Sequence, residues 1–95
     1  MKYNYDTERE YWVVKGRYNE KDLYVTYVET KNIHIGHETI TKDYFAYSNQ
    51  LAYAFLFMFK DRAEEFVKRN AQELKTFNMK PVKILVSYKE IDDND

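Results

Sequence analysis

The chain has no cysteine, a single proline and only two glycines. Without cysteine it forms no disulfide, no zinc–thiolate site and no thiol nucleophile. Without a glycine-rich segment it has no loop of the kind that cradles phosphate groups. No apolar run approaches the roughly 20 residues of a membrane-spanning helix, and the first residues lack the pattern of a secretory signal. We therefore expect a cytoplasmic protein that uses no cofactor and no membrane.

An excess of charge of either sign is lacking too. Fifteen Lys and Arg residues face 16 Asp and Glu residues, which leaves a net charge of −1. Such a chain has no long-range field that would draw it onto nucleic acid or an anionic membrane. Aromatic residues are abundant instead, at 18% of the chain with ten tyrosines. Because tyrosine is enriched at protein interfaces, this composition favours a contact surface.

The length of 95 residues predicts a single domain over residues 1–95, since domains rarely divide below roughly 100 residues. We expect fraying at both ends, at about residues 1–8 and at about residues 90–95, where the tail is acidic.

Three segments are rich in β-branched and aromatic residues and are predicted strands: 10–17, 22–30 and 82–89. The first two are separated by four residues, so we expect an antiparallel hairpin. Pro81 suits the start of the last strand. Residues 31–50 have no clean period, and there we expect a short strand and a long irregular connection.

A helix is predicted over about residues 61–77. Apolar side chains recur there at helical spacing, and we expect Phe66, Val67 and Leu74 to enter the core. Asn78 suits a left-handed cap, and Pro81 prevents the helix from continuing.

The run YAFLFMF, from Tyr53 to Phe59, fits two structures because both of its faces are apolar. It is either a strand or the first turns of one long helix that begins near Asn49. Its alternating aromatics and the onset of charge at Lys60 favour the strand.

With that strand, residues 53–58, the helix and residues 82–89 form a β-α-β unit with parallel strands. The expected fold class is therefore α+β. It is a small mixed β-sheet of order β-β-(β)-β-α-β, with one main helix packed on one face.

No constellation of catalytic or metal-binding side chains stands out, so we expect neither an enzyme nor a metal site. Ser48 and Ser87 are the only serines, and no histidine is expected near Ser87. The glutamates of the helix lie on its solvated face, away from any pocket. His34 and His37 lack a third ligand.

The segment LAYAFLFMFKDRA (residues 51–63) resembles the third strand and second helix of the RNA-recognition motif. Residues 53–56 match the signature strand in order, whereas three positions depart from it: Leu51, Ala52 and Met58. The helix that this family has between its first two strands is missing. The resemblance implies base stacking on Tyr53 and Phe55. A single-stranded nucleic-acid binder is therefore our alternative function.

The segments YWVVKG, DLYVTYVE and KDRAEEFVKR resemble in style the small proteins of phages and mobile elements of low-GC Gram-positive bacteria. The resemblance implies a phage-type inhibitor that binds a host protein, such as a CRISPR nuclease.

Our leading hypothesis from the sequence is a non-enzymatic protein-binding module. The helix would cover one face of the sheet, and the other face would present tyrosines to a host protein, a mobile-element protein or a second copy. The candidate partner-binding residues are Tyr11, Tyr24, Tyr53, Lys83 and Lys89.

Overall fold

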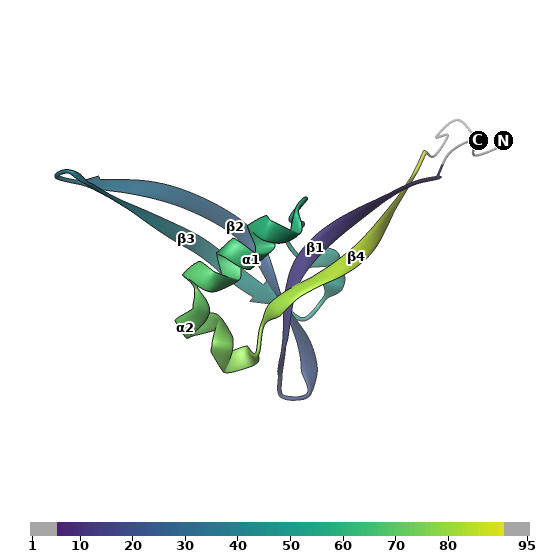
Figure 1. Ribbon diagram of the computed structural model, residues 1–95. Coiled ribbons are helices and arrows are strands. Elements are labelled where there is room, and N and C mark those ends of the chain that lie inside the picture. The colour runs from purple at the N-terminus through teal and green to yellow at the C-terminus, as the bar shows by residue number, and fades with distance from the viewer. Residues whose placement is uncertain (1–5, 91–95) are drawn as a thin grey trace.

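The computed structural model describes residues 6–90 and contains a four-stranded sheet with two short helices (Figure 1). The strand order is β3-β2-β1-β4. The strands are β1 (Asp6–Tyr18), β2 (Lys21–Ile35), β3 (Glu38–Ser48) and β4 (Lys80–Lys89). The helices are α1 (Lys60–Arg69) and α2 (Ala71–Leu74), with short 3-10 turns η1 (Leu51–Tyr53) and η2 (Lys75–Phe77). Helix and strand are both present, as expected, but strand dominates.

The predicted first hairpin and last strand are confirmed. Strand β1 pairs antiparallel with β2 across the short turn, with Lys15 opposite Tyr24. Strand β4 pairs antiparallel with the other side of β1, from Asp6 opposite Lys89 to Lys15 opposite Lys80. Each strand is longer than its sequence pattern indicated. Pro81 lies near the start of β4, an edge strand, which is a position in a sheet where proline is tolerated.

The prediction of an irregular connection over residues 31–50 is wrong. Strand β2 continues to Ile35, and β3 returns beside it from Glu38. Gly36 makes the reversal with a φ of 62°, a left-handed conformation that glycine adopts without strain. Residues 30–42 are exposed on both sides of this ribbon, so no buried face gives the sequence a clean alternation.

Both alternatives for Tyr53–Phe59 are wrong. After η1 the chain is extended but forms only one isolated bridge, between Trp12 and Phe57. The Phe55 N–H donates to the Val25 carbonyl at 2.9 Å, and the backbones of Phe57 and Trp12 exchange two bonds of 2.8 Å. The segment is thus wedged between β1 and β2 where these strands separate.

This wedge overturns the β-α-β unit as well. The last strand pairs with β1 and not with residues 53–58, and every strand pair among residues 6–90 is antiparallel. The sheet is therefore not mixed.

The core lies between the helices and one face of the sheet. Phe66 and Leu74 are fully buried there, and Val67 packs against them, as predicted from the helical stripe. The helix breaks at Asn70, whose side-chain amide donates to the Phe66 carbonyl at 2.9 Å. Asn78 has φ 51° and ψ 42°, which confirms its left-handed cap.

The molecule is extended because two ribbons project from the core (Figure 1). The β2–β3 arm is residues 29–44, and the β1–β4 arm is residues 6–12 with 83–89. The Cα radius of gyration is 16.9 Å and the extents are 59 × 37 × 21 Å. A compact domain of this length would have a radius of gyration of about 12 Å.

The sheet has a helix face, toward α1 and α2, and an outer face, turned away from them. A β-bulge shifts the register of β2 between Thr26 and Glu29, and Tyr27 takes a φ of 49° there. A bulge places two residues of one strand opposite one residue of the other. Side chains that alternate before the bulge therefore change faces after it, which puts Ile33 and Ile35 on the outer face.

At the chain ends, Thr7 and Glu8 pair with Tyr88 and Ser87 in the sheet. The remainder of the predicted frayed ends, at residues 1–5 and in the acidic tail beyond Glu90, lies outside the described residues. Neither helix within residues 6–90 has the length and apolar character to span a membrane.

Candidate functional site

The outer face of the β2–β3 arm carries uncovered aliphatic side chains. Ile33 lies opposite Ile40 across the two strands, and Ile35 lies two pairs nearer the tip. Their exposed fractions are 37%, 46% and 60%. Nearer the core, Lys31 and Lys42 lie over the ring of Tyr44, at 5.4 and 5.2 Å from its centroid. The arm therefore has an apolar end and a cation–π cluster on the same face.

The opposite face of this arm is polar and is anchored to α1 by Asp43. The Asp43 carboxylate accepts hydrogen bonds from Arg69 at 2.8 and 3.1 Å, from Asn70 at 2.7 Å and from Thr30 at 2.6 Å. Burial raises the pKa of Asp43, but these hydrogen bonds outweigh it and hold the pKa below its ordinary value. This network fixes the base of the arm and leaves its outer face free.

The outer face of the β1–β4 arm carries aromatic and aliphatic side chains. The register places Tyr11 opposite Ile84 and Thr7 opposite Tyr88. The hydroxyls of Tyr11 and Tyr88 are 3.1 Å apart and share a hydrogen bond, which raises the pKa of Tyr88. Both arms thus turn their most apolar surface away from the helices.

The five predicted partner-binding residues do not form one surface. Tyr11 lies on the outer face as expected, but Tyr24 is buried at 7% exposure and cannot present its ring to a partner. Lys83 lies on the helix face, paired with Glu10 at 3.6 Å and over the ring of Trp12.

The two remaining predicted residues are also apart from Tyr11. Tyr53 is exposed on η1, and Lys89 ends β4, opposite Asp6. The connection over residues 31–50 does not cover the outer face, because it is itself the β2–β3 arm.

The stacking role that the RNA-recognition motif implies for Tyr53 and Phe55 lacks a sheet surface here. Phe55 packs against the core and meets Phe57 edge-on with centroids 4.9 Å apart. Tyr53 lies in the 3-10 turn η1 instead of a central strand. The predicted pair of adjacent stacking rings is therefore not formed.

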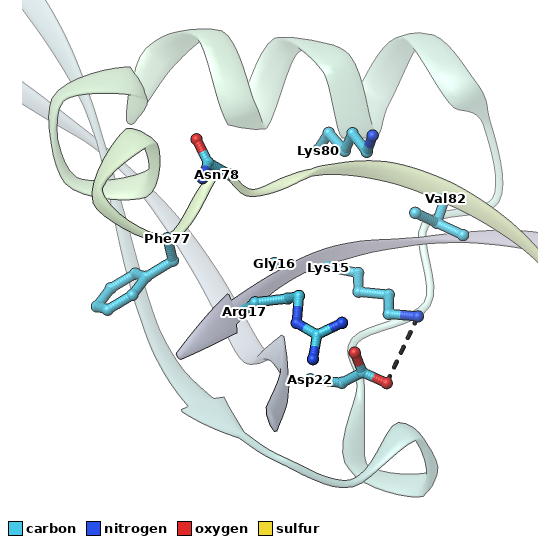
Figure 2. A pocket seen from close by; sticks show the side chains of 8 residues that line it. All are labelled: Lys15, Gly16, Arg17, Asp22, Phe77, Asn78, Lys80 and Val82. Carbon is cyan, nitrogen blue, oxygen red and sulfur yellow. Dashed lines mark ion pairs between the residues drawn. The ribbon is translucent and has the colours of Figure 1, made fainter. Parts of the chain in front are cut away.

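A second site, the hairpin pocket, lies where the β1–β2 hairpin meets the start of β4 (Figure 2). It encloses about 330 Å³ and is lined by Lys15, Gly16, Arg17, Asp22, Phe77, Asn78, Lys80 and Val82. A Cβ at Gly16 would collide with the Phe77 carbonyl oxygen. Glycine at this position therefore lets the chain leading into β4 cross closely over β1 and form one wall of the pocket.

The histidines and acidic residues do not gather into a metal centre within residues 6–90: no group of three or more potential ligands occurs there. His34 Nδ1 lies 3.0 Å from the Thr39 hydroxyl on the β2–β3 arm. Tyr47 donates to Glu73 at 3.0 Å, and burial together with this bond raises its pKa. That contact ties β3 to α2 and serves packing.

Sequence reasoning missed the two features that define these surfaces. The sequence shows the alternation of Ile33 and Ile35 with polar residues. Because it did not indicate β3 as a pairing strand, this alternation did not predict a projecting arm. The hairpin pocket left no sequence signal, because Lys15 and Lys80 are far apart in the chain and meet only through the β1–β4 register. No protein family, curated protein or solved structure matches this chain.

Proposed function

We propose that this protein is a non-enzymatic protein-binding module whose interface is the outer face of its two arms. The observation that carries the proposal is the exposure of Ile33, Ile35 and Ile40 on one side of a projecting two-stranded ribbon. Such a ribbon is marginally stable by itself, and soluble monomers rarely leave contiguous apolar surface without a use. A partner laid on this face would supply the missing layer.

The charges of the β2–β3 arm support a protein partner. On the outer face Lys31 and Lys42 are accompanied by Glu29 and Glu38, so cations and anions balance. Binding to nucleic acid draws most of its non-specific affinity from an excess of cations. An apolar patch bordered by both signs of charge suits a protein surface of the same composition.

The identity of the partner stays a prediction. A bacterial host protein such as a CRISPR nuclease rests on the style of the sequence alone, and a second copy of the chain fits the same surface. In either case Tyr11 and Tyr88 on the β1–β4 arm extend the interface, because their rings lie on the same side of the sheet.

Two adjacent substitutions on β3 test the proposal. Ile40→Lys places a charge on the outer face, and Thr41→Lys places the same charge on the opposite face, where Thr41 donates to Asn32. We expect wild type and Thr41→Lys to capture the same protein from bacterial lysates, or to dimerise equally by light scattering, and Ile40→Lys to lose that interaction at least tenfold. The proposal would be contradicted if wild type is monomeric and no protein is captured by wild type and Thr41→Lys but lost by Ile40→Lys.

The alternative of single-stranded nucleic-acid binding is favoured only by the exposure of Tyr53, at 62%. We expect fluorescence anisotropy with single-stranded DNA and RNA to give no more than non-specific binding of roughly 10⁻⁴–10⁻⁶ M. Nanomolar binding at physiological salt that Tyr53→Ala abolishes would reverse the order of the two functions.

A further inference from the structure

The hairpin pocket has more positive charge than its own residues neutralise. Lys15, Arg17 and Lys80 line it together with a single carboxylate, Asp22. Three positive charges and one negative charge leave a formal charge of +2 in a site of about 330 Å³. The rest of the lining is neutral and includes the apolar residues Phe77 and Val82.

Two of these cations are placed against each other by the sheet itself. Lys15 of β1 lies directly opposite Lys80 of β4 in the register, and like charges directly opposite each other on neighbouring strands are destabilising. Lys15 reaches Asp22 at 3.6 Å. Within residues 6–90 no carboxylate lies within ion-pair distance of the Lys80 ammonium, and Figure 2 shows it apart from the Lys15–Asp22 pair.

A second pair of opposed lysines in this sheet has neighbouring groups that offset the repulsion between the two positive charges. Lys31 lies opposite Lys42, but both ammonium groups lie over the ring of Tyr44 and Lys31 also pairs with Glu29 at 3.5 Å. Lys80 has no such ring contact among residues 6–90. Lys15 pairs with Asp22 and lies 5.8 Å from the centroid of the Tyr24 ring. Within residues 6–90, Lys80 is therefore the member of the pocket-lining pair that has neither kind of contact.

Arg17 gives the pocket a fork of donors. One guanidinium nitrogen donates to the Glu20 carbonyl at 2.7 Å, which holds the side chain beside the turn while its other N–H groups remain for a ligand. A guanidinium fork fits phosphate oxygens bidentately, and lysines add point charges at the same kind of site.

We infer that the hairpin pocket binds a dianionic phosphate group, carried by a small phosphomonoester. The excess of two positive charges matches a phosphate dianion and would be only half neutralised by a carboxylate. The volume lies at the lower end of the range of small-molecule sites, roughly 300–1,000 Å³, so the phosphate and a small apolar substituent against Val82 fit together. This inference is independent of the protein-binding function proposed for the arms.

The first test is an NMR titration of the full chain with phenyl phosphate at pH 7.5 and constant ionic strength. We expect saturable shifts of the Gly16, Arg17 and Lys80 amides, weaker ones with inorganic phosphate, and none with benzoate, which has the same ring and a single charge. At pH 5, where a phosphomonoester with a second pKa of about 6 is largely a monoanion, the affinity should fall. Equal shifts with benzoate would overturn the inference.

Matched lysine variants provide the second test. Lys80→Ala and Lys42→Ala each remove one member of an opposed lysine pair, but only the first lines the pocket. We expect Lys80→Ala to weaken phenyl phosphate binding about tenfold or more, since a hydrogen bond to a charged group contributes at least that much, and Lys42→Ala to leave it within about twofold.

The thermal unfolding midpoint separates binding from folding. Without ligand, Lys80→Ala should melt no lower than wild type, because Lys80 is exposed and makes no ion pair or ring contact among residues 6–90. A lower melting point with unchanged affinity would show that Lys80 serves packing and not a ligand. Equal loss of affinity in Lys80→Ala and Lys42→Ala would show that the ligand responds to the net charge of the protein and not to the pocket. Each of these two results would overturn the inference.

Discussion

At the scale of single residues, Asp43 is the side chain that connects the β2–β3 arm to the helices. Its carboxylate is 1% exposed, whereas its partner Arg69 is 36% exposed, so the pair is half-buried and satisfied by four hydrogen bonds. A carboxylate that accepts several bonds is stabilised in its ionised form. Its pKa is therefore lower in the folded than in the unfolded chain, and folding depends on its charge.

The ionisation of Asp43 makes the free energy of unfolding depend on pH. A lowered folded pKa contributes stability that is complete above the unfolded pKa of about 4 and is lost as the pH falls through the folded value. We predict that Asp43→Asn lowers the free energy of unfolding by about 1–3 kcal/mol at pH 7. This difference from wild type should shrink between pH 4 and pH 2 in urea unfolding. A difference that does not change with pH would show that the charge of Asp43 is irrelevant.

Phe66 anchors the helix to the sheet. It is fully buried and meets the rings of Phe45 and Phe57 at centroid distances of 5.0 and 5.5 Å. We predict that Phe66→Ala costs about 3–5 kcal/mol, measured by denaturant unfolding. The control is Phe59→Ala, whose ring is 60% exposed and whose loss should cost under about 0.5 kcal/mol. Equal costs at the two sites would contradict this core.

At the scale of elements, the wedge over residues 54–57 explains why the two arms diverge. Strands β1 and β2 pair only from Lys15 to Tyr18 with Lys21 to Tyr24. Beyond that point the wedge bonds to Val25 on one side and Trp12 on the other, so each strand is released to pair with its outer neighbour alone. Phe55 and Phe57 thus fill the junction of the two ribbons, whereas Tyr53 and Phe59 at the ends of the apolar run are exposed.

The β2–β3 arm should therefore be the least protected part of the sheet. Its strands pair only with each other, and residues 30–42 are exposed. The buried contact nearest to them is that of Asp43 with α1. We predict that amides between Asn32 and Thr41 exchange with solvent at least tenfold faster than those of Val13 and Val25, because local opening exposes no core. Equal protection, measured by hydrogen exchange and NMR, would mean that the arm is covered in solution.

At the scale of the whole molecule, the separation of the arms sets the shape. We predict that small-angle scattering of the monomer gives a radius of gyration near 17 Å, in keeping with the Cα value of 16.9 Å and well above the roughly 12 Å of a compact domain. A value near 12 Å at low concentration would show that the arms fold back. A rise with concentration that Ile40→Lys removes would identify the second copy as the partner.

Local patterns in the sequence determined the elements that bury one face. The stripe of Phe66, Val67 and Leu74 predicted the helix, and the alternation in residues 10–17, 22–30 and 82–89 predicted three strands, because burial on one side imposes a period on the chain. Asn78 and Pro81 indicated where the helix ends, since backbone conformations are local properties.

The tertiary structure alone decided the features that depend on distant neighbours. In the apolar run over Tyr53–Phe59 only Phe55 and Phe57 bond to the neighbouring strands, so burial imposes no period on the run as a whole. Their partners Val25 and Trp12 lie far from them in the chain. Likewise Tyr24 was expected on a contact face, but it is buried, and the cations of the hairpin pocket are gathered only by the β1–β4 register. Register and burial are set by which strands pair, and the sequence of one strand does not specify its neighbour.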